Sequence, residues 1–378
     1  MTSQSSKYLH IVSFDIPFPP NYGGVMDVFY KIKALAQLGV KIHLHAFEYG
    51  RNRAEELNKY CESIEYYSRD TRAIKHLSKL PYIVISRNSE SLLTNLLKDD
   101  YPILFEGLHT SGFISDSRLK SRMKIVRTHN IEHEYYKSLS QSTSHPLKKN
   151  YFALEAKKLK NYEQSLAQAD VLAAISQNDY HYLKSKFSHV QYIPAFHPNN
   201  KIGSLIGRGD YLLYHGNLSV EENITAAVYL VDEVFSKLTI PSIIAGKNPS
   251  KILIEKISKY THIQLIANPS FDKMEQLISL AHINILPTFQ ATGIKLKLLQ
   301  SLALGRHCIV NKSMVENTGL ESLCSIQNHA ADIIREIKDF MSQDFSLEMF
   351  AKREQIFSEH FSNIKNAQKL MNLISACP

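Results

Sequence analysis

The chain has 378 residues, of which 44% are hydrophobic, and it carries a formal net charge of +8. This length predicts two domains rather than one, and the apolar fraction is sufficient for a core in each. The basic charge favours anionic partners such as nucleotides or phospholipids. Because no basic helix with base-reading side chains is visible, we expect no nucleic-acid ligand.

The sequence also lacks the marks of a membrane-spanning or secreted protein. No apolar run approaches the ~20 residues of a transmembrane helix, and the first residues, MTSQSSKYLH, contain no signal-peptide core. The four cysteines are scattered without the spacing of metal ligands. We therefore expect a cytoplasmic protein with reduced thiols and no metal site, in which Cys308 is a small hydrophobic residue of a core strand.

The N-terminal half predicts alternating strands and helices. It begins with a strand at 9–14, a helix at 25–38 whose apolar residues have helical spacing, and a strand at 42–47. Further strands are predicted at 82–85, 103–105, 124–127 and 171–175. Such alternation is typical of a parallel sheet that is covered by helices on both faces.

The pattern changes near residue 193, where IPAFHPNNKIGSLIGRGD is rich in Pro, Asn and Gly and predicts a linker. A second series of strands and helices follows, and the chain is mostly helical from residue 330 onward. The strands of this second series are predicted at 211–218, 242–245, 263–266, 283–286 and 307–310. We therefore predict two Rossmann-like domains, residues 1–197 and 198–349, and a helical C-terminal segment.

The segment LPTFQATGIKLKLLQSLALGRHCIVN, residues 286–311, carries the strongest functional pattern. It predicts a strand, a short loop with Thr292 and Gly293, a helix and a second strand. Lys295 and Lys297 fall in the predicted first turn of that helix, where the helix dipole disfavours cations. Two lysines there indicate an anion, with phosphate the usual candidate, held jointly by backbone N–H groups and ammonium charge. The alternative, two solvated surface lysines, is disfavoured because ligands bind at such strand ends.

Four segments, in their order, resemble the retaining GT-B glycosyltransferases of the family 4 type: FPPNYGG, VRTHNIEHEYY, ADVLAAIS and ATGIKLKLLQSLALGRHCIVN. The resemblance covers nearly the whole chain. It implies an α/β fold of two Rossmann-like domains facing across a cleft, with residues 350–378 crossing back to the first domain. It also implies a metal-independent hexosyltransferase that uses no cofactor besides its nucleoside-diphosphate sugar. The first domain would bind the acceptor and the second the donor.

In the first domain the resemblance implies that His129 contacts the donor sugar as the catalytic residue and that Gly24 lies beside the donor phosphates. The acceptor would contact Tyr22, Gly23, Asn130 and Glu132. A glycine pair before a helix permits close approach of a ligand to the backbone, although an ordinary turn is the alternative. Asn130 also suits a helix N-cap, and Glu132 an exposed helix face.

In the second domain the resemblance implies a larger set of donor contacts, namely Gly216, Asn217, Lys247, Thr292, Gly293, Ile294, Lys295, Lys297 and Gln300. Asn223 is better explained as a residue at the start of a helix. The family often carries two glutamates eight positions apart, and Thr292 and Gln300 stand there in this chain. Gln300 keeps one acceptor oxygen but loses a charge worth about 1 kcal/mol in such a hydrogen bond.

We therefore predict the transfer of a hexose, mannose or similar, from a nucleoside-diphosphate sugar to a hydroxyl of a glycan or lipid-linked glycan, in polysaccharide biosynthesis. Two alternatives stay open. A non-catalytic GT-B subunit that binds a partner is supported by Thr292 and Gln300, and a sugar-nucleotide epimerase would need acids and bases that the sequence does not place. The basic charge also favours peripheral contact with an anionic membrane at its inner face.

Overall fold

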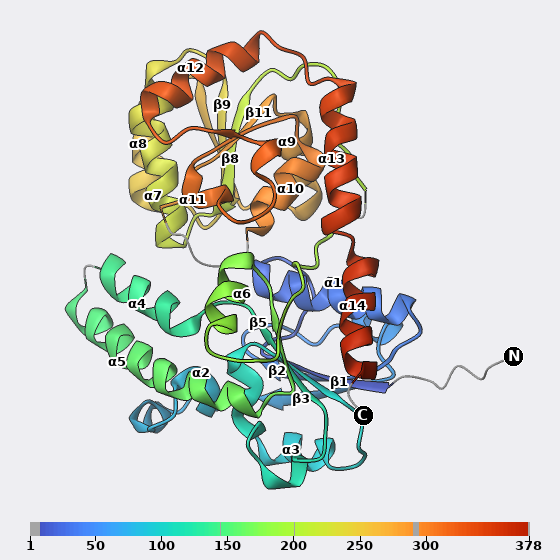
Figure 1. Ribbon diagram of the computed structural model, residues 1–378. Helices are drawn as coiled ribbons and strands as arrows, with labels where there is room; N and C mark the ends of the chain where they lie inside the picture. Colours follow the sequence, from blue (N-terminus) through green and yellow to red (C-terminus); the bar gives the residue numbers. More distant parts are fainter. Residues whose placement is uncertain (1–7, 144, 200, 290–294, 377–378) are drawn as a thin grey trace, which may run out of the picture. The chain divides into compact units, whose positions relative to one another are not determined.

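The computed structural model describes residues 8–143, 145–199, 201–289 and 295–376. The predicted donor residues Thr292, Gly293 and Ile294 lie outside the described residues. Contacts within the chain form two units, one of Met1–Phe196 with Phe361–Pro378 and one of His197–Ala291 with Lys295–His360. The predicted linker has little regular structure, and the boundary between the units falls within it (Figure 1).

The first unit is built on a seven-stranded parallel sheet in the order β3-β2-β1-β4-β5-β6-β7. The strands are β1 (Tyr8–Ser13), β2 (Lys41–Glu48), β3 (Ser63–Ser68), β4 (Ile103–Glu106), β5 (Lys124–Thr128), β6 (Val171–Ala174) and β7 (Val190–Tyr192). The chain builds outward from β1 to β3 and then returns to place β4 on the other side of β1. Ligands of open parallel sheets bind beyond the carboxyl ends of the strands at such a reversal.

Helices cover both faces of this sheet and form a separate apolar core on each face. They are α1 (Gly23–Gln37), α2 (Tyr82–Ile85), α3 (Glu90–Leu96), α4 (Glu132–Ser142), α5 (Pro146–Tyr162), α6 (Gln177–Lys184) and α14 (Asn363–Ala376), with the 3₁₀ segments η1 (Glu55–Lys59), η2 (Ala73–Leu77), η3 (Leu108–Phe113), η4 (Ser117–Leu119) and η5 (Glu163–Gln168).

The strand predicted at 82–85 is wrong, because these residues form the short helix α2, which starts directly after Pro81. Ile83 and Val84 are buried in the same core as the residues of α3. A short apolar run does not distinguish a strand from one buried helical turn, and proline is well suited to the start of a helix. The sequence predicts neither β3 nor β7, the two edge strands of this sheet.

The second unit is built on a six-stranded parallel sheet in the order β10-β9-β8-β11-β12-β13. Its strands are β8 (Leu212–Asn217), β9 (Ser242–Lys247), β10 (Ile263–Ala267), β11 (Ile283–Leu286), β12 (His307–Val310) and β13 (Ser325–Ile326). The order reverses between β8 and β11, so the loops after these two strands lie at the position where a ligand is expected. Cys308 is buried in β12, as predicted.

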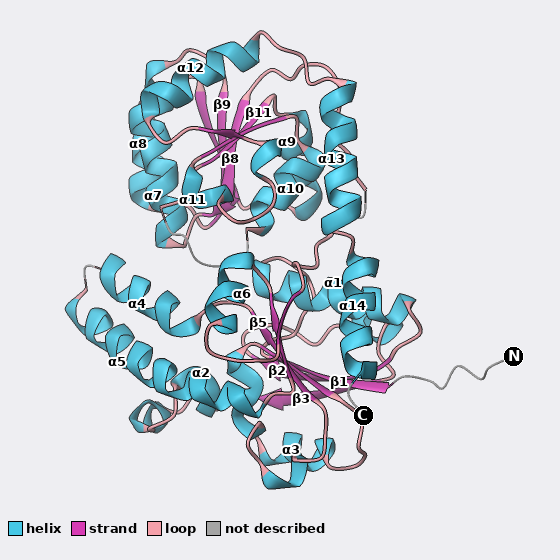
Figure 2. Ribbon diagram, in the orientation of Figure 1, coloured by secondary structure: helices cyan, strands magenta, loops and turns pink. Residues whose placement is uncertain are grey.

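Helices lie on both faces of the second sheet (Figure 2). They are α7 (Glu221–Tyr229), α8 (Lys251–Ile257), α9 (Phe271–Leu280), α10 (Leu296–Leu304), α11 (Lys312–Val315), α12 (Ala330–Met341) and α13 (Leu347–His360), with the π-helical turn η6 (Leu230–Val234) and the 3₁₀ segments η7 (Phe235–Lys237) and η8 (Glu321–Leu323). The predicted helix after residue 293 is α10, and Gly305 is its C-cap residue.

The C-terminal helices divide between the units. Helix α14 packs against α1, and its residues Ala367, Leu370 and Met371 are buried in the core of the first unit. Helix α13 belongs to the second unit, where its Arg353 donates to the carbonyl oxygens of Leu302 and Gly305. The segment that packs with the first unit therefore begins at residue 361, whereas we expected it to begin at 350.

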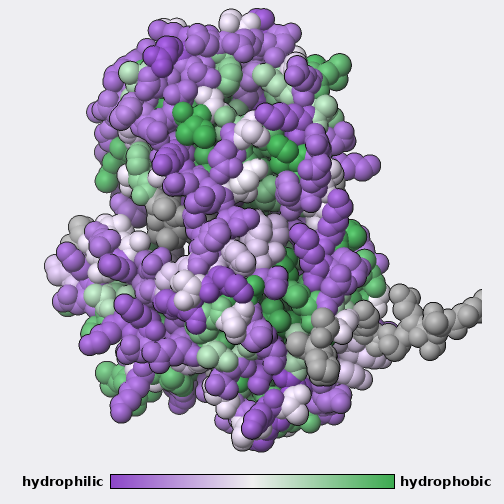
Figure 3. Space-filling model, in the orientation of Figure 1, coloured by the Kyte–Doolittle hydropathy of each residue, from purple (hydrophilic) through white to green (hydrophobic). Residues whose placement is uncertain are grey.

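Exposed apolar side chains gather on one side of the first unit. Ile74 and Leu77 of η2 are 68% and 85% exposed, and Leu147 and Leu154 of α5 are 75% and 63% exposed. Lys158 of α5 donates to a backbone carbonyl of η2, so these two segments lie side by side. Figure 3 shows hydrophobic side chains in this region of the first unit. Within the described residues, no helix has the length and apolarity that crossing a membrane requires.

Candidate functional site

In the first unit, the loops after β1, β4 and β5 bring predicted site residues to one edge of the sheet. The register pairs Val12 with Phe105 and Phe105 with Val126, so the carboxyl ends of the three strands lie level. His129 follows β5 and is only 5% exposed. Its ring lies edge-on to that of Phe14, which follows β1, with 5.3 Å between the ring centroids. The structure thus buries His129 at the edge where ligands of such sheets bind.

Two glycines permit this close packing. A Cβ atom on Gly24 would lie 2.6 Å from Cζ of Phe14. Gly107 has φ +71°, and a Cβ atom there would lie 2.8 Å from Nδ1 of His109. Both positions therefore require glycine if Phe14 and His109 are to stay beside His129. The donor-phosphate role of Gly24 stays a prediction, since its observed contact is with an aromatic ring.

A buried network of charged side chains lies beneath this edge, formed by residues of α1, β4 and β5. The Nζ atom of Lys31 lies 2.8 Å from Oδ2 of Asp27 and 2.8 Å from Oε1 of Glu106. Arg127 donates to both carboxylate oxygens of Asp27, at 2.8 and 3.1 Å. The Nε2 atom of His129 lies 3.0 Å from Oε2 of Glu106. Two carboxylates thus meet two cations in a cluster whose members are at most 5% exposed.

Asp27 and Arg127 connect this network to residues 194–196, where the N-terminal segment of the first unit ends. Its Oδ1 atom accepts from the backbone N–H of Phe196 at 2.8 Å, and Arg127 donates to the carbonyl oxygen of Pro194 at 3.0 Å. Although burial raises the pKa of Asp27, the charges of Arg127 and Lys31 hold it well below its usual range. Asp27 is therefore an ionised carboxylate with a full set of donors.

Three of these residues, Asp27, Glu106 and His129, have side chains of the types that bind metal ions. One ligand atom each from Asp27, Glu106 and His129 lies within 4.8 Å of the others. However, the ammonium group of Lys31 contacts both carboxylates and supplies the positive charge that a metal ion would bring. The residues therefore form an internally paired cluster, and they do not fit a divalent cation without displacement of Lys31.

Glu132 and its neighbours form a second buried polar group, next to His129 in sequence. Glu132 is 4% exposed, so the alternative that it lies on an exposed helix face is wrong. Burial raises the pKa of Glu132 to about 8, against a hydrogen bond from Asn130 that lowers it. Its Oε1 atom lies 3.8 Å from Nδ1 of His109. Helix α4 has Ile131 at its N-cap, so Asn130 is not the capping residue.

Tyr22 and Gly23 lie at the start of α1. Tyr22 is the N-cap residue, and its hydroxyl donates to Oδ2 of Asp15 at 2.7 Å. Its ring lies under the guanidinium of Arg51, 5.5 Å from the ring centroid. Gly23 is the first residue of the helix. The acceptor contacts assigned to these residues stay predictions, as do those of Asn130 and Glu132.

In the second unit, the carboxyl end of β8 holds Gly216 and Asn217. A Cβ atom on Gly216 would lie 3.1 Å from Cγ of Asn223, so this strand end and the first turn of α7 are in close contact. The side-chain amide of Asn223 donates to the carbonyl oxygen of Asn217 at 3.0 Å. Asn223 is thus not a helix cap, since α7 has Val220 at its N-cap.

Lys297 projects from the first turn of α10 onto the same strand end. Its Nζ atom donates to Oδ1 of Asn223 at 2.8 Å and lies 5.5 Å from the centroid of the Tyr214 ring. Among the described residues, Lys297 forms no ion pair with a carboxylate. Burial lowers its pKa to about 8, although the charge of Glu222 opposes this shift. A half-buried ammonium group whose described hydrogen-bond partner is neutral is suited to an anionic ligand.

The remaining predicted donor residues are less constrained. Lys295 is the N-cap residue of α10 and does not lie in its first turn, which corrects that prediction. Lys247 ends β9, is exposed, and pairs in register with Asn217. Gln300 is half-buried in the middle of α10. Their contacts with a donor stay predictions.

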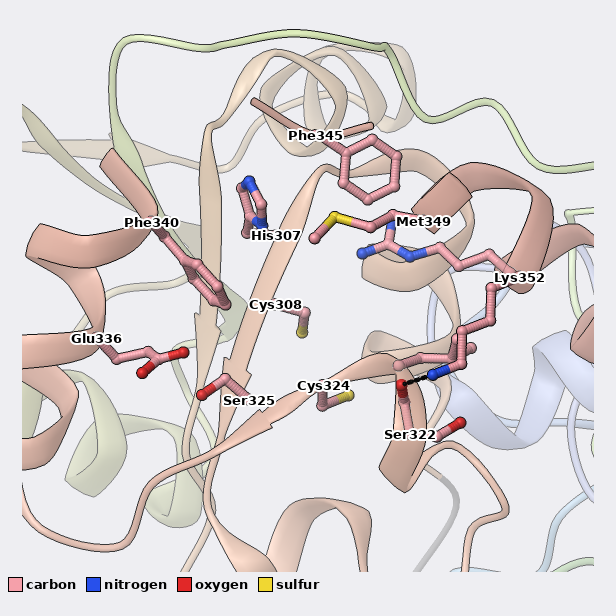
Figure 4. A pocket seen from close by; sticks show the side chains of 12 residues that line it. His307, Cys308, Ser322, Cys324, Ser325, Glu336, Phe340, Phe345, Met349 and Lys352 are labelled. Atoms are coloured by element: carbon pink, nitrogen blue, oxygen red, sulfur yellow. Dashed lines mark hydrogen bonds between the residues drawn. The ribbon is translucent and has the colours of Figure 1, made fainter. Parts of the chain in front are cut away.

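A cavity of about 360 Å³ lies elsewhere in the second unit, and Figure 4 shows its lining. Its walls include His307, Cys308, Cys324 and Arg353. His307 is the first residue of β12, so the cavity lies at the amino end of this strand, away from the carboxyl ends where Gly216 and Lys297 lie. A hydrogen bond with Cys308 and burial raise the pKa of Cys324 well above its ordinary value, so this thiol is not activated.

Sequence reasoning missed Asp27, Lys31, Glu106 and His109. Two signals were available. Asp27 and Lys31 are four residues apart on a helix and therefore share a face, which here is the buried one. Glu106 ends the apolar run ILFE, and a charged residue at such a position requires a partner. His109 had no local signal, because its position depends on the left-handed backbone of Gly107.

The sequence was compared with protein-family models and with known proteins. No protein-family model matches the sequence. The chain is 26% identical over 375 residues to an uncharacterized 44.6 kDa protein in the cps region of Klebsiella pneumoniae, an alignment that covers 94% of this chain and 92% of that protein.

Solved structures show the fold more clearly. TarM is similar with a TM-score of 0.73 and 10% identity, over 100% of both chains. A mutant of TarM from S. aureus, in complex with fondaparinux, α-GlcNAc-glycerol and UDP, has a TM-score of 0.70 and 11% identity, over 98% of this chain and 100% of that one. HepE of Anabaena, in complex with UDP and glucose, has a TM-score of 0.66 and 11% identity over the same shares. With its two parallel α/β units, this chain has the GT-B fold of the glycosyltransferases.

Proposed function

We propose that the protein is a retaining glycosyltransferase that moves a hexose from a nucleoside-diphosphate sugar to a hydroxyl of a glycan or lipid-linked glycan. The observation that carries this proposal is Lys297, a half-buried cation that donates to the neutral side-chain amide of Asn223 beside the carboxyl end of β8. A diphosphate supplies the negative charge that this position lacks. The complexes of TarM and HepE with UDP support a uridine nucleotide, and guanosine diphosphate sugars such as GDP-mannose are the next candidates.

The second unit binds the donor in this proposal. Lys297 and the backbone N–H groups at the start of α10 stabilise the charge that develops on the leaving diphosphate, and no metal ion is needed for this task. Gly216 permits close approach of the phosphates, and Asn217, Lys247, Lys295 and Gln300 contact the rest of the nucleotide-sugar. Thr292, Gly293 and Ile294 complete this set.

The first unit supplies contacts to the sugar and the acceptor in this proposal. His129 contacts the transferred sugar, and Tyr22, Gly23, Asn130 and Glu132 contact the acceptor. The carboxylates of Asp27 and Glu106 are held by Lys31 and Arg127, so neither is a free nucleophile for a double displacement. The acceptor oxygen instead bonds to the anomeric carbon as the bond to the phosphate oxygen breaks, and that phosphate oxygen takes the acceptor proton.

We further propose that the acceptor is presented at an anionic membrane surface. Ile74, Leu77 and Leu147 are strongly exposed, and Lys148 and Lys149 follow Leu147 on the exposed side of α5. Apolar side chains beside basic ones bind anionic bilayers in two ways: the apolar groups are buried in the bilayer, and the basic groups are attracted to the anionic lipids. The relative from a cps region supports a polysaccharide product. Flotation with anionic and neutral liposomes at low and high salt tests this idea, and equal recovery with both would contradict it.

The experiment for the proposed function is a thermal-shift panel of GDP, UDP and dTDP sugars. A ligand at a hundred times its Kd adds about 2.7 kcal/mol to the free energy of unfolding. We expect a shift with one base family in the wild-type chain and in Lys251→Met, which removes an exposed lysine of the same unit, and a much smaller shift in Lys297→Met.

Two outcomes would redirect this proposal. No shift with any nucleotide-sugar in folded protein would favour the non-catalytic subunit that binds a partner. Conversion of the bound nucleotide-sugar to an isomer without any acceptor would favour the epimerase. Transfer to an acceptor with inverted configuration at the anomeric carbon would contradict the retaining mechanism alone.

A further inference from the structure

We propose that Cys308 and Cys324 are a modification site that closes to a disulfide bond when a small disulfide compound enters the cavity beside β12. This cavity lies at the amino end of β12, apart from the residues assigned to the donor and the acceptor. The pair therefore does not depend on the proposed function, and sugar transfer does not use either thiol.

The strand register places the two cysteines opposite each other. Ile309 of β12 lies opposite Ser325 of β13 in a parallel pair of strands. Cys308 and Cys324 each precede one member of this pair, so they are the next opposed positions. Neighbouring strands lie about 4.8 Å apart, and a disulfide bond needs about 4.4–6.8 Å between its Cα atoms. The backbone therefore holds the two residues at a separation that a disulfide bond can span.

The two thiols also meet in the folded chain. Cys308 and Cys324 form a side-chain hydrogen bond, and both line the cavity of about 360 Å³. Figure 4 shows the two side chains next to each other in its wall. Both are free thiols. Sulfur atoms in such contact reach bonding distance by side-chain rotation, without any change in the order of the strands.

The cavity gives a small reagent access to the pair. Cys308 is only 2% exposed, whereas Cys324 is half-buried, so Cys324 reacts first. The cavity is large enough for a short aliphatic disulfide compound. The side chains of Phe340, Phe345 and Met349 form an apolar part of its wall and suit the carbon atoms of such a compound.

The chemistry consists of two thiol–disulfide exchanges. Cys324 loses its proton and its sulfur attacks one sulfur of the compound, whose S–S bond breaks and releases one half as a thiol with that proton. The sulfur of Cys308 then attacks Sγ of Cys324, and the second half leaves as a thiol with the proton of Cys308. Two cysteines are thus oxidised to one disulfide, and the compound is reduced to two thiols.

The exchange is slow at neutral pH. A hydrogen bond with Cys308 and burial raise the pKa of Cys324 well above its ordinary value, and only the thiolate attacks a disulfide. Mild alkali therefore speeds the first step. The pair is suited to slow equilibration with small disulfide compounds.

The disulfide bond closes the connection from β12 to β13 into a loop. This connection contains α11 and η8, and it begins at Asn311, whose amide donates to the carbonyl oxygen of Thr288 at 2.6 Å. The loop encloses the 15 residues from 309 to 323. A disulfide around such a loop stabilises the native chain because it restricts the unfolded chain. We expect the midpoint of thermal unfolding to rise by about 5–10 °C on oxidation.

The first experiment maps the disulfide bond by mass spectrometry on the full chain. The folded protein is incubated at pH 8.5 with 2-hydroxyethyl disulfide and 2-mercaptoethanol, quenched with acid, alkylated in denaturant and digested. We expect peptides that join Cys308 to Cys324 as the main product. In Cys308→Ala the reaction should stop at a mixed disulfide on Cys324. In Cys324→Ala the buried thiol of Cys308 should stay reduced.

The matched control is Cys61→Ala, which removes a cysteine of the first unit whose pKa is raised by burial to about 12. It should leave the joined peptides unchanged. Free thiols at both Cys308 and Cys324 in the treated wild-type chain would overturn the proposal. Joined peptides that appear only when urea is added would overturn it as well, because the folded register would then not bring the sulfur atoms together.

The second experiment compares thermal unfolding of the oxidised and the reduced wild-type chain, and it needs no folded variant. We expect the rise of about 5–10 °C, and its loss when 2-mercaptoethanol in excess reduces the bond. A disulfide bond that lowers the midpoint would overturn the proposal, because it would show that the native strands are strained by the bond.

Discussion

The two units each hold a lysine beside the carboxyl edge of a parallel sheet, and the two lysines have opposite surroundings: Lys31 is fully buried and Lys297 is half-buried. Lys31 in the first unit contacts the carboxylates of Asp27 and Glu106. Lys297 in the second unit donates to the neutral amide of Asn223, and burial lowers its pKa to about 8. The first cation is neutralised by two carboxylates, whereas the second has no carboxylate partner among the described residues.

A cation inside a protein can stabilise the structure through an ion pair, or it can bind a ligand. A buried ion pair is held in place because removal of one partner leaves the other uncompensated, so the network of Lys31 fixes the geometry of His129. A buried cation without a carboxylate partner destabilises the folded chain until a ligand arrives, and that is a common property of binding sites. Substitutions in the two clusters should therefore change stability in opposite directions.

The largest effect is expected for Asp27→Asn. This change leaves Lys31 and Arg127 with less negative charge than they need and should lower the free energy of unfolding by about 3–5 kcal/mol. Urea denaturation at pH 7 measures it. The control is Glu62→Gln in the exposed pair with Lys41, which should change stability by about 1 kcal/mol or less. A loss below that of the control would mean that the network does not hold the unit together.

A somewhat smaller loss is expected for Arg353→Met in the second unit. Arg353 is 3% exposed and donates to the carbonyl oxygen of Leu302 and to Oγ of Ser204, both at 3.0 Å. Because the substitution leaves these buried acceptors without the donor that Arg353 supplies, the free energy of unfolding should fall by about 2–3 kcal/mol. Arg335→Met removes an exposed guanidinium from α12 and should change stability little. Equal stability of the two variants would contradict this role.

Lys297→Met should have the opposite sign. The pKa of Lys297 is about 8 in the folded chain, below its ordinary value of 10.5, so the unfolded chain binds more protons between these values and stability rises with pH there. The substitution should raise the free energy of unfolding at pH 7 by about 1–2 kcal/mol and weaken nucleotide-sugar binding at least tenfold.

Urea denaturation of Lys297→Met and the wild-type chain at pH 7 and pH 10.5 tests the sign. The advantage of the variant should shrink over this interval, because the wild-type lysine loses its proton. Wild-type affinity for the nucleotide-sugar should also fall as the pH rises above about 8. A variant that is less stable than the wild-type chain at pH 7 would show that Lys297 is a structural cation like Lys31.

The smallest effect at pH 5 is expected for Glu132→Gln, which sharpens the comparison because Glu132 is a buried acid of the first unit. Its pKa is raised from 4.5 to about 8 by burial, so the folded chain binds more protons between these values and wild-type stability falls as the pH rises through them. The glutamine variant should match the wild-type chain at pH 5 and exceed its stability by about 4 kcal/mol at pH 9, because one pKa unit corresponds to about 1.4 kcal/mol. An advantage that does not change with pH would contradict the raised pKa.

Much of the fold could be predicted from local sequence. Most strands of both sheets coincide with the predicted apolar runs, and Gly305 ends α10 as expected. These features depend on residues close together in the sequence. The spacing of apolar residues predicts a strand or helix, and glycine ends a helix, within a few positions of the chain. The exceptions are the strands β3, β7 and β13, which the sequence did not predict, and the short helix α2, whose apolar run suited a strand as well as a buried helical turn.

The site itself was decided by tertiary structure. Lys297 and Asn223 are 74 residues apart, and Arg127 and Asp27 are 100 residues apart, so no local pattern predicts either pair. The sequence determined the parallel α/β units, the glycine at position 24 and the histidine after β5. The order of strands then decided which charges meet, because adjacent strands of a parallel sheet come from distant parts of the chain. That order paired Lys31 with two carboxylates and left Lys297 with a neutral amide.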